Sequence, residues 1–318
     1  MMTFSKETTG AVLVANFSKN VANKTIVITG ASSGSLGGQT AIDLAHSQPP
    51  PAHLILLARS EAKVQPVIDQ INTSTTGPLA KFLPILLDDF DSIRSAAKAI
   101  TDIVGPQGKI DILMNYAGIM AVPYSLSKAG IESQFATNHI GHFLLTLRLK
   151  SHLSKNARII NVSSDGYKLG RFDPEKYNFD DGKSYHPWSG YGQSKTANIL
   201  FTKGLAKRGV ISFALHPGVI FGTGLTVGMT DSDKLFEQLE EISVRNTGEA
   251  MVMGEGKTVE QGVATAIRAV VDPSLDGKNG SFLDDCEVVE VLDYARDDKL
   301  VESLWELSEK LVGEKFVI

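Results

Sequence analysis

Two side chains that can move a proton stand four positions apart, at Tyr191 and Lys195, in a stretch predicted to form one helix through Phe201. Positions i and i+4 share a helix face, so the ammonium would lie beside the phenol. We expect it to favour the phenolate and lower the pKa of Tyr191 from its usual value of about 10. Such a phenol can exchange a proton with an alcohol or carbonyl oxygen. Because this spacing also arises by chance, the chemistry needs a cofactor and a second donor.

A glycine-rich turn near the start of the chain is a candidate cofactor site. The apolar run at residues 25–29 is followed by Gly30, Gly34 and Gly37, and then by a helical pattern. Glycines in a strand–turn–helix unit let the backbone approach a pyrophosphate, and the helix N-terminus offers free N–H groups. Taken alone, the segment also fits a tight turn with no ligand.

The residue after the second predicted strand, at 53–58, indicates which dinucleotide would bind. An NAD site usually has an acidic residue there, whereas this chain has Arg59, followed by Lys63. A guanidinium suits a 2′-phosphate, so the sequence favours NADP(H) over NAD(H). The alternative is a surface arginine at a strand end.

Composition excludes several other classes of protein. The 318 residues carry a net charge of -5 and no basic run, which argues against a nucleic-acid partner. The single cysteine, Cys286, excludes an internal disulfide and a cysteine-based zinc site. No apolar run is long enough to span a membrane, and residues 1–23 lack the pattern of a signal peptide. We therefore expect a cytoplasmic protein with no bound metal.

Apolar strands alternate with amphipathic helices along the chain, which predicts one doubly wound parallel sheet covered by helices on both faces. We interpret residues 1–318 as a single Rossmann-type α/β domain, with an insertion at about 166–187 and a substrate lid at about 222–256. The expected strands are residues 25–29, 53–58, 82–87, 110–114, 158–162 and 210–215, with short ones at 281–283 and 288–292.

Together, these features resemble the short-chain dehydrogenase/reductase family over nearly the whole chain. The family's Thr-Gly-x-x-x-Gly turn corresponds to residues 29–34, its Asn-Asn-Ala-Gly to 115–118, and its Pro-Gly after the sixth strand to 217–218. The stretches at 138–143, 187–191 and 194–201 look most like the retinol-dehydrogenase-like branch, especially its fungal members.

The resemblance implies a catalytic set of Ser164, Tyr191, Lys195 and Asn138. Tyr191 would exchange a proton with the substrate oxygen, and Ser164 would hydrogen-bond the same oxygen. Lys195 would also bind the nicotinamide ribose, and Asn138 would hold a water on the proton path. Besides Tyr191 and Lys195, the implied cofactor residues are Gly30, Ser32, Ser33, Gly34, Leu36, Gly37, Arg59, Lys63, Asp88, Asn115, Ala117, Gly118, Pro217, Gly218, Val219 and Thr223.

Three features depart from the family pattern. The stretch from Gly34 to Gly37 is one residue longer than usual, so the diphosphate loop could differ in shape. Tyr116 replaces the second asparagine, and the gap between Ser164 and Tyr191 is longer than usual because of the insertion. The insertion could border the substrate pocket or form a loop packed by its own aromatic residues.

The sequence predicts an NADP(H)-dependent carbonyl reductase or alcohol dehydrogenase acting on a lipophilic or aromatic ketone, aldehyde or alcohol. The family also makes a homodimer possible. Residues 30–34 fit the nucleophile elbow of an α/β-hydrolase, but they follow the first strand, too early in the sheet for that fold. The remaining alternatives are an extended-type epimerase or dehydratase and a catalytically silent NADP(H)-binding regulatory protein. The substrate, the reaction direction, its stereochemistry and the oligomeric state stay open.

Overall fold

The computed structural model describes residues 3–74, 80–230 and 232–316, whose strands form one eight-stranded sheet. The strand order is β3-β2-β1-β4-β5-β6-β7-β8. Every neighbouring pair up to β7 is parallel, and only β8 runs antiparallel to its neighbour. The order reverses direction between β1 and β4, which is where open sheets of this kind bind ligands, beyond the carboxyl ends of the strands. The predicted fold class is confirmed.

The strands are close to those predicted, but the third is shifted, the fifth begins at Leu153 rather than at 158, and the last ends at Val289 rather than at 292. They are β1 (Thr25–Thr29), β2 (His53–Ala58), β3 (Ala80–Pro84), β4 (Ile110–Asn115), β5 (Leu153–Val162), β6 (Ile211–Leu215), β7 (Phe282–Asp284) and β8 (Glu287–Val289). The third strand was expected at 82–87 but ends at Pro84. β3 is the edge strand, where a proline removes no essential ladder hydrogen bond.

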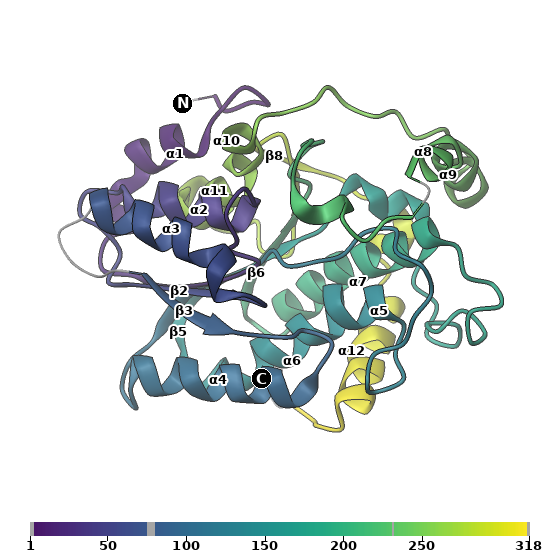
Figure 1. Cartoon of the computed structure of the whole chain (residues 1–318), viewed down its shortest axis with the longest axis horizontal. Helices are drawn as coiled ribbons and strands as arrows, with labels where there is room; N and C mark the ends of the chain where they lie inside the picture. The colour runs from purple at the N-terminus through teal and green to yellow at the C-terminus, as the bar shows by residue number, and fades with distance from the viewer. Residues whose placement is uncertain (1–2, 75–79, 231, 317–318) are drawn as a thin grey trace.

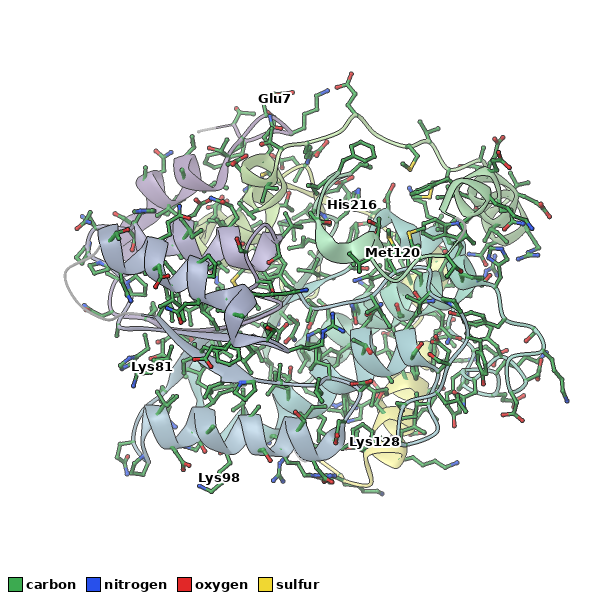
Figure 2. All side chains as sticks on the ribbon, in the orientation of Figure 1. Glu7, Lys81, Lys98, Met120, Lys128 and His216 are labelled. Carbon is green, nitrogen blue, oxygen red and sulfur yellow. The ribbon has the colours of Figure 1, made fainter. Side chains whose placement is uncertain are left out.

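Alternate residues of each central strand face opposite helix layers. Ile26 and Ile28 of β1 belong to the core packed against α1 (Gly10–Phe17), α2 (Leu36–Ala45), α3 (Glu61–Ser74) and α11 (Ala264–Val271). Val27 belongs to the core beneath α4 (Phe90–Val104), α6 (Gly141–Arg148), α7 (Pro187–Lys207) and α12 (Asp298–Val312). The two layers lie on opposite sides of the sheet in Figure 1, and side chains fill the space between (Figure 2).

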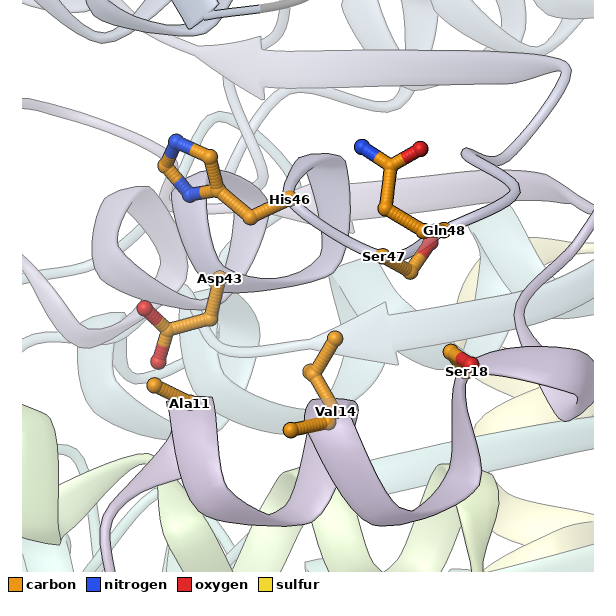
Figure 3. Close-up of a pocket in the computed structure, with 8 residues that line it drawn as sticks. Ala11, Val14, Ser18, Asp43, His46, Ser47 and Gln48 are labelled. Carbon is orange, nitrogen blue, oxygen red and sulfur yellow. The ribbon is translucent and has the colours of Figure 1, made fainter.

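Helix α1 lies in the segment that the sequence analysis described only as a polar lead-in. It buries Leu13 and Val14 against the core, beside α2 and α11. Asp43 of α2 faces the start of α1, and an ideal Cβ on Gly10 would lie 2.2 Å from its Oδ2. Figure 3 shows Asp43 opposite Ala11 and Val14 in the groove between the two helices.

Two stretches of helix differ from the predicted ones. The long helix expected at 132–152 is divided into α5 (Ser133–Phe135), the π-helical turn η2 (Ala136–Ile140), α6 and the 3₁₀ turn η3 (Lys150–His152). The helix expected at 259–271 is divided into α10 (Val259–Gly262) and α11. Residues 222–256 contain η5 (Gly224–Thr226), α8 (Ser232–Glu237) and α9 (Leu239–Thr247). Within the described ranges, no helix has the length and apolar character needed to cross a membrane.

Candidate active site

Tyr191 lies in the second turn of α7 and Lys195 in the third, and both are buried at 4% exposure. The helix begins at Pro187, a residue favoured in the first turn, and the Trp188 N–H donates to Nδ1 of His186, which caps the helix. This start of α7 fixes where the Tyr191 side chain enters the site.

Lys195 is held against the end of β5. Its Nζ donates a 3.0 Å hydrogen bond to the carbonyl oxygen of Val162, the last residue of that strand. Ser163 Oγ returns a 2.8 Å hydrogen bond to the carbonyl oxygen of Lys195. The two bonds fix α7 to the chain segment that continues directly into Ser164.

Ser164 and the Tyr191 ring meet at Gly166. The Gly166 N–H donates a 3.0 Å hydrogen bond to Ser164 Oγ. An ideal Cβ on Gly166 would lie 2.6 Å from Cε1 of Tyr191 and 3.2 Å from Ser164 Oγ, so only glycine allows this approach. The structure therefore brings the predicted serine and tyrosine together despite the insertion between them.

The protonation states differ from the expectation. Burial raises the pKa of Tyr191 to about 12, and the hydrogen bond with Ser164 offsets part of that rise. Burial lowers the pKa of Lys195 to about 8. The expected lowering of the Tyr191 pKa by Lys195 is therefore wrong for this structure: Nζ lies 5.4 Å from the ring centroid and bonds to Val162 instead. At neutral pH Tyr191 is a phenol, the form that donates a proton.

Asn138 lies in the π-helical turn η2 and is fully buried. Its Oδ1 accepts from the Ile119 N–H at 2.8 Å, and its Nδ2 donates to the Ile119 carbonyl and to Ser194 Oγ, both at 2.9 Å. A Cβ on Gly118 would lie 3.0 Å from Asn138 Oδ1 and 3.8 Å from Lys195 Nζ. Asn138, Gly118 and Lys195 therefore adjoin one another.

The glycine turn is one residue longer than usual, and its Ser35 caps the N-terminus of α2. Ser35 Oγ accepts from the Gly38 N–H at 3.0 Å, which caps α2, and lies 2.7 Å from the carbonyl oxygens of Gly30 and Ser32. Gly30 has φ +72°, and a Cβ there would come within 2.9 Å of the Ala117 backbone. Gly34 is exposed, with open space where its Cβ would be, and Leu36 and Gly37 form the first turn of α2.

The two predicted phosphate cations lie beside that turn. The Ser33 N–H donates a 2.7 Å hydrogen bond to the carbonyl oxygen of Lys63, which joins the glycine turn to the start of α3. Arg59, at the end of β2, and Lys63 are both exposed. Within the described part of the chain, no carboxylate pairs with either side chain. Two free cations next to exposed backbone N–H groups suit the 2′-phosphate and diphosphate of NADP(H).

The loop after β4 is joined to the glycine turn by Thr29. Thr29 Oγ1 accepts from the Tyr116 and Ala117 N–H groups at 3.0 and 3.1 Å. Tyr116 Oη lies 2.7 Å from Thr40 Oγ1 of α2, so the residue that replaces the usual asparagine links this loop to α2.

Asn115 and Asp88 have different surroundings, although both were predicted to bind the cofactor. Asn115 Nδ2 donates to Asn161 Oδ1 at 2.8 Å inside the sheet, and its Oδ1 is buried with no partner among the described residues. Its side chain thus lies in the buried sheet rather than at the open strand ends. Asp88 is exposed just beyond β3.

Beyond β6, residues 217–219 form a loop whose residues the family resemblance assigns to the cofactor. The Lys257 N–H donates to the Val219 carbonyl oxygen at 2.8 Å, and the Lys257 side chain, 9% exposed, forms an ion pair with Asp285. A Cβ on Gly218 would lie 2.6 Å from Lys257 Cδ. Lys257 thus joins the end of the predicted lid to this loop. Thr223 is half-buried before η5.

An apolar cluster covers the open side of Tyr191. It contains residues from four parts of the chain: Ala121, Leu169, Trp188, Tyr191, Leu235, Leu239 and Ile242, with Met120, Met229 and Met251 at its margin. Trp188 Nε1 donates a 2.6 Å hydrogen bond to the Leu235 carbonyl oxygen, which ties α8 to α7. Figure 2 labels Met120 beside the lid segment and His216 at the end of β6.

The insertion is packed by its own aromatic residues and also borders the neighbouring loop. The Tyr185 ring contacts the Phe179 and Tyr124 rings, each with centroids 5.2 Å apart. Tyr185 Oη donates a 2.8 Å hydrogen bond to the Val122 carbonyl oxygen, next to Ala121 of the apolar cluster. The insertion is therefore packed by its own aromatic residues, and its place beside a substrate pocket stays a prediction.

Two buried histidines and the single cysteine make packing or hydrogen-bond contacts within the protein. His139 Nε2 lies 2.9 Å from Ser308 Oγ and His142 Nε2 lies 2.9 Å from Thr29 Oγ1, and no group of described residues could hold a metal ion. Burial raises the pKa of Cys286 to about 11, as expected of a packing residue. The sequence analysis gave no role to Thr29 or Lys257. The position of Thr29 at the end of a predicted strand was visible in the sequence and could have indicated its role, but no local pattern points to Lys257.

The sheet order, the glycine turn at the switch point and the Tyr–Lys pair at the strand ends define a nicotinamide-dependent oxidoreductase of the doubly wound class. Residues 24–178 match the family model described as short chain dehydrogenase. Mouse retinol dehydrogenase 12 is 32% identical over 315 residues, 96% of this chain and 90% of that protein. Human retinol dehydrogenase 11 is 32% identical over 296 residues, 91% of this chain and 86% of that protein.

The chain therefore belongs to the short-chain dehydrogenase family, and it is retinol-dehydrogenase-like. Among solved structures, a protein from Mycobacterium paratuberculosis matches 98% of this chain and 99% of its own length, at TM-score 0.72 and 29% identity. Chicken liver carbonyl reductase shares the fold, at TM-score 0.60 and 21% identity over 85% of this chain and 100% of its own. The protein is thus an oxidoreductase, and its family uses nicotinamide cofactors.

Proposed function

We propose that the protein is an NADP(H)-dependent oxidoreductase that interconverts a lipophilic or aromatic ketone or aldehyde with its alcohol. The observation that carries the proposal is the placement of the Tyr191 phenol between Ser164 and the apolar cluster, with Lys195 one helical turn below. A proton donor beside an apolar cluster suits a carbonyl group at the end of a hydrophobic molecule.

In this proposal the protein orients the reactants and handles the proton. The bound nicotinamide supplies or accepts the hydride. Tyr191, held as a phenol by burial, donates its proton to the carbonyl oxygen. Ser164 donates a hydrogen bond to the same oxygen and stabilises its developing charge. Lys195 keeps a positive charge near the ring, and its bond to Val162 keeps the ammonium in place.

Several residues would hold the cofactor. The glycine turn at Ser32, Ser33 and Gly34, beside the N-terminus of α2, is assigned to the diphosphate; the Ser33 N–H itself bonds to the Lys63 carbonyl oxygen, so Ser33 would contribute its hydroxyl. Arg59 and Lys63 support a preference for NADP(H), because both are exposed, Lys63 bonds through its main chain to Ser33, and neither has a carboxylate partner among the described residues. Asp88 is assigned to the adenine end, Gly118 to the ribose, and 217–219 to the carboxamide.

The substrate class rests on the apolar cluster and on residues 222–256, which we assign as a lid. Leu235, Leu239 and Ile242 bury their side chains against Trp188 and Tyr191, and three methionines lie at the margin. Methionine side chains adapt to irregular apolar ligands. Relatives named retinol dehydrogenases fit a lipophilic alcohol or aldehyde as substrate.

The test is NADPH oxidation by the purified protein over a panel of carbonyl compounds, with NADH run alongside. The panel contains retinal, aromatic aldehydes, aliphatic ketones, and small hydrophilic sugars and acids. We expect turnover of the lipophilic members, with NADPH preferred. Turnover of sugars or acids alone would contradict the substrate class, and NADPH binding without any turnover would favour the catalytically silent alternative. A cytoplasmic location and a homodimer stay predictions.

A further inference from the structure

His142 lies in α6, four residues after Asn138, and both its ring nitrogens have partners. Nδ1 lies 3.0 Å from the main-chain carbonyl oxygen of Asn138, and Nε2 lies 2.9 Å from Thr29 Oγ1. The ring is buried at 2% exposure. It therefore touches the end of β1, where the glycine turn begins, and the π-helical turn that carries Asn138.

The partners determine the hydrogen positions on the ring. A carbonyl oxygen only accepts, so Nδ1 carries the hydrogen that bonds to Asn138. Thr29 Oγ1 already accepts from the Tyr116 and Ala117 N–H groups, so its own hydrogen points to Nε2. Burial, with a smaller contribution from the Lys195 charge, lowers the pKa of His142 to about 4 although the bond to the Asn138 carbonyl opposes the fall, so the ring is neutral at pH 7.

We propose that His142 is a positioning residue that couples the cofactor turn to the proton-transfer network. The inference rests on the proposed function for the reaction that it serves. One side of the ring holds Thr29, which in turn holds the loop at Tyr116 and Ala117. The other side holds Asn138, whose side chain bonds to Ile119 and Ser194. A movement of the glycine turn is transmitted to Asn138 through one rigid, uncharged ring.

Neutrality is part of this role. A protonated ring would turn Nε2 from the acceptor of the Thr29 hydroxyl into a donor, which leaves that hydroxyl only the Met114 carbonyl oxygen at 3.5 Å, and it would place a second positive charge near Lys195. The neutral ring with its hydrogen on Nδ1 donates to the Asn138 carbonyl oxygen and accepts from the Thr29 hydroxyl at the same time. Neither asparagine nor glutamine can do so, because each reaches only one of the two ring-nitrogen positions.

The hydrogen position can be measured without cofactor or substrate. In ¹⁵N-labelled protein at pH 7, the ring nitrogens of His142 are assigned by comparison with His142→Asn. We expect a neutral ring protonated at Nδ1. A ring protonated at Nε2, or a cation, would overturn the proposal. The signals measured are those of the wild-type protein, and either His142→Asn or His142→Gln can supply the assignment, so the readout survives if one of the two variants fails to fold.

Two variants divide the role between the two sides of the ring. His142→Asn places an amide N–H near the Nδ1 position and keeps the Asn138 contact. His142→Gln reaches the Nε2 position and keeps the Thr29 contact. The asparagine variant should raise the NADPH Kd about tenfold with kcat nearly unchanged, as expected for one lost buried hydrogen bond. The glutamine variant should lower kcat about tenfold with the Kd nearly unchanged.

His139→Asn is the matched control. His139 is equally buried three residues earlier, but its ring contacts Ser308 and the Phe135, Phe143 and Phe201 rings, away from the site. This variant should lower the melting temperature without altering Kd or kcat. Variants of His142 that change Kd and kcat no more than His139→Asn would show that the ring only packs. If wild-type protein bound no NADPH, the proposed function would fail, whereas the ¹⁵N result would still decide the role of the ring.

Discussion

Lys195 Nζ and the carbonyl oxygen of Val162 are joined by a 3.0 Å hydrogen bond, which fixes the ammonium two residues before Ser164. Asn198 Nδ2 donates to the same oxygen at 3.2 Å. The end of β5 thereby sets the distance from the ammonium to the Tyr191 ring. The ammonium is buried and near a phenol that burial keeps protonated, and the pH behaviour of the reaction follows from this arrangement.

Carbonyl reduction should lose rate as the pH rises above about 8. Burial lowers the pKa of Lys195 to about 8, so its ammonium loses its proton there, whereas Tyr191, with a pKa of about 12, stays a phenol. The measurement is kcat/KM for reduction between pH 6 and 10, with NADPH binding recorded at each pH. Lys195→Arg, whose charge does not titrate, should remove the fall. A wild-type profile that stays level to pH 10 would contradict the assignment.

Cofactor preference should move toward NADH in Arg59→Asp. The substitution removes an exposed guanidinium directly after β2 and places a carboxylate where an NAD site usually has one. We expect the ratio of kcat/KM for NADPH over NADH to fall by about tenfold or more, the loss of one charge-assisted contact. Lys81→Asp is the control, since Lys81 is an exposed cation in β3. An unchanged ratio in Arg59→Asp would exclude it as the phosphate contact.

Lys257→Met should loosen the lid end from the loop at Gly218. Loss of the ion pair with Asp285 should cost little stability, about 1 kcal/mol or less, because Asp285 is half-exposed. Yet KM for the carbonyl substrate should rise, since Lys257 supports both the loop and the lid. Lys6→Met breaks a more exposed ion pair, with Glu255 of the lid, and should leave KM unchanged. Equal effects of the two variants would refute a specific role for Lys257.

Asp43→Asn should stabilise the protein at neutral pH. Burial raises the pKa of Asp43 to about 6 from an ordinary 3.8, although its bond with Gln39 opposes the rise, and Oδ2 has no partner among the described residues. A raised pKa means that this carboxyl favours the fold below pH 3.8 and loses that contribution as the pH rises through about 6. The free energies of unfolding of the two proteins should therefore diverge between pH 4 and 7.5, by up to about 3 kcal/mol. A constant difference would mean that Asp43 does not titrate in this range.

The sequence was sufficient to predict the parallel sheet and the residues that meet at the candidate site. Continuous apolar strands identify buried parallel strands, and the glycine turn and the Tyr–Lys spacing each require one local geometry. Ser164 and Tyr191 were paired through the family resemblance, and the structure brings them together at Gly166.

Other features depend on contacts that no local pattern encodes. The π-helical turn at Asn138 and the docking of α1 on α11 are set by packing between distant segments. The protonation of Tyr191 was predicted in the wrong direction because spacing along a helix does not report burial, and here burial outweighs the nearby charge. Ser35 was visible as an extra residue, but its role as the cap of α2 depends on how the turn closes.

The most direct measurement is deuterium transfer from NADPH deuterated at the nicotinamide C4 to an aromatic aldehyde or retinal, with wild type and Tyr191→Phe compared. The wild-type product should carry the deuterium on the carbinol carbon. Tyr191→Phe should bind NADPH with nearly unchanged Kd but form that product about 10²- to 10⁴-fold more slowly, because it lacks the proton donor. A Tyr191→Phe variant that forms the deuterated alcohol at the wild-type rate would contradict the account.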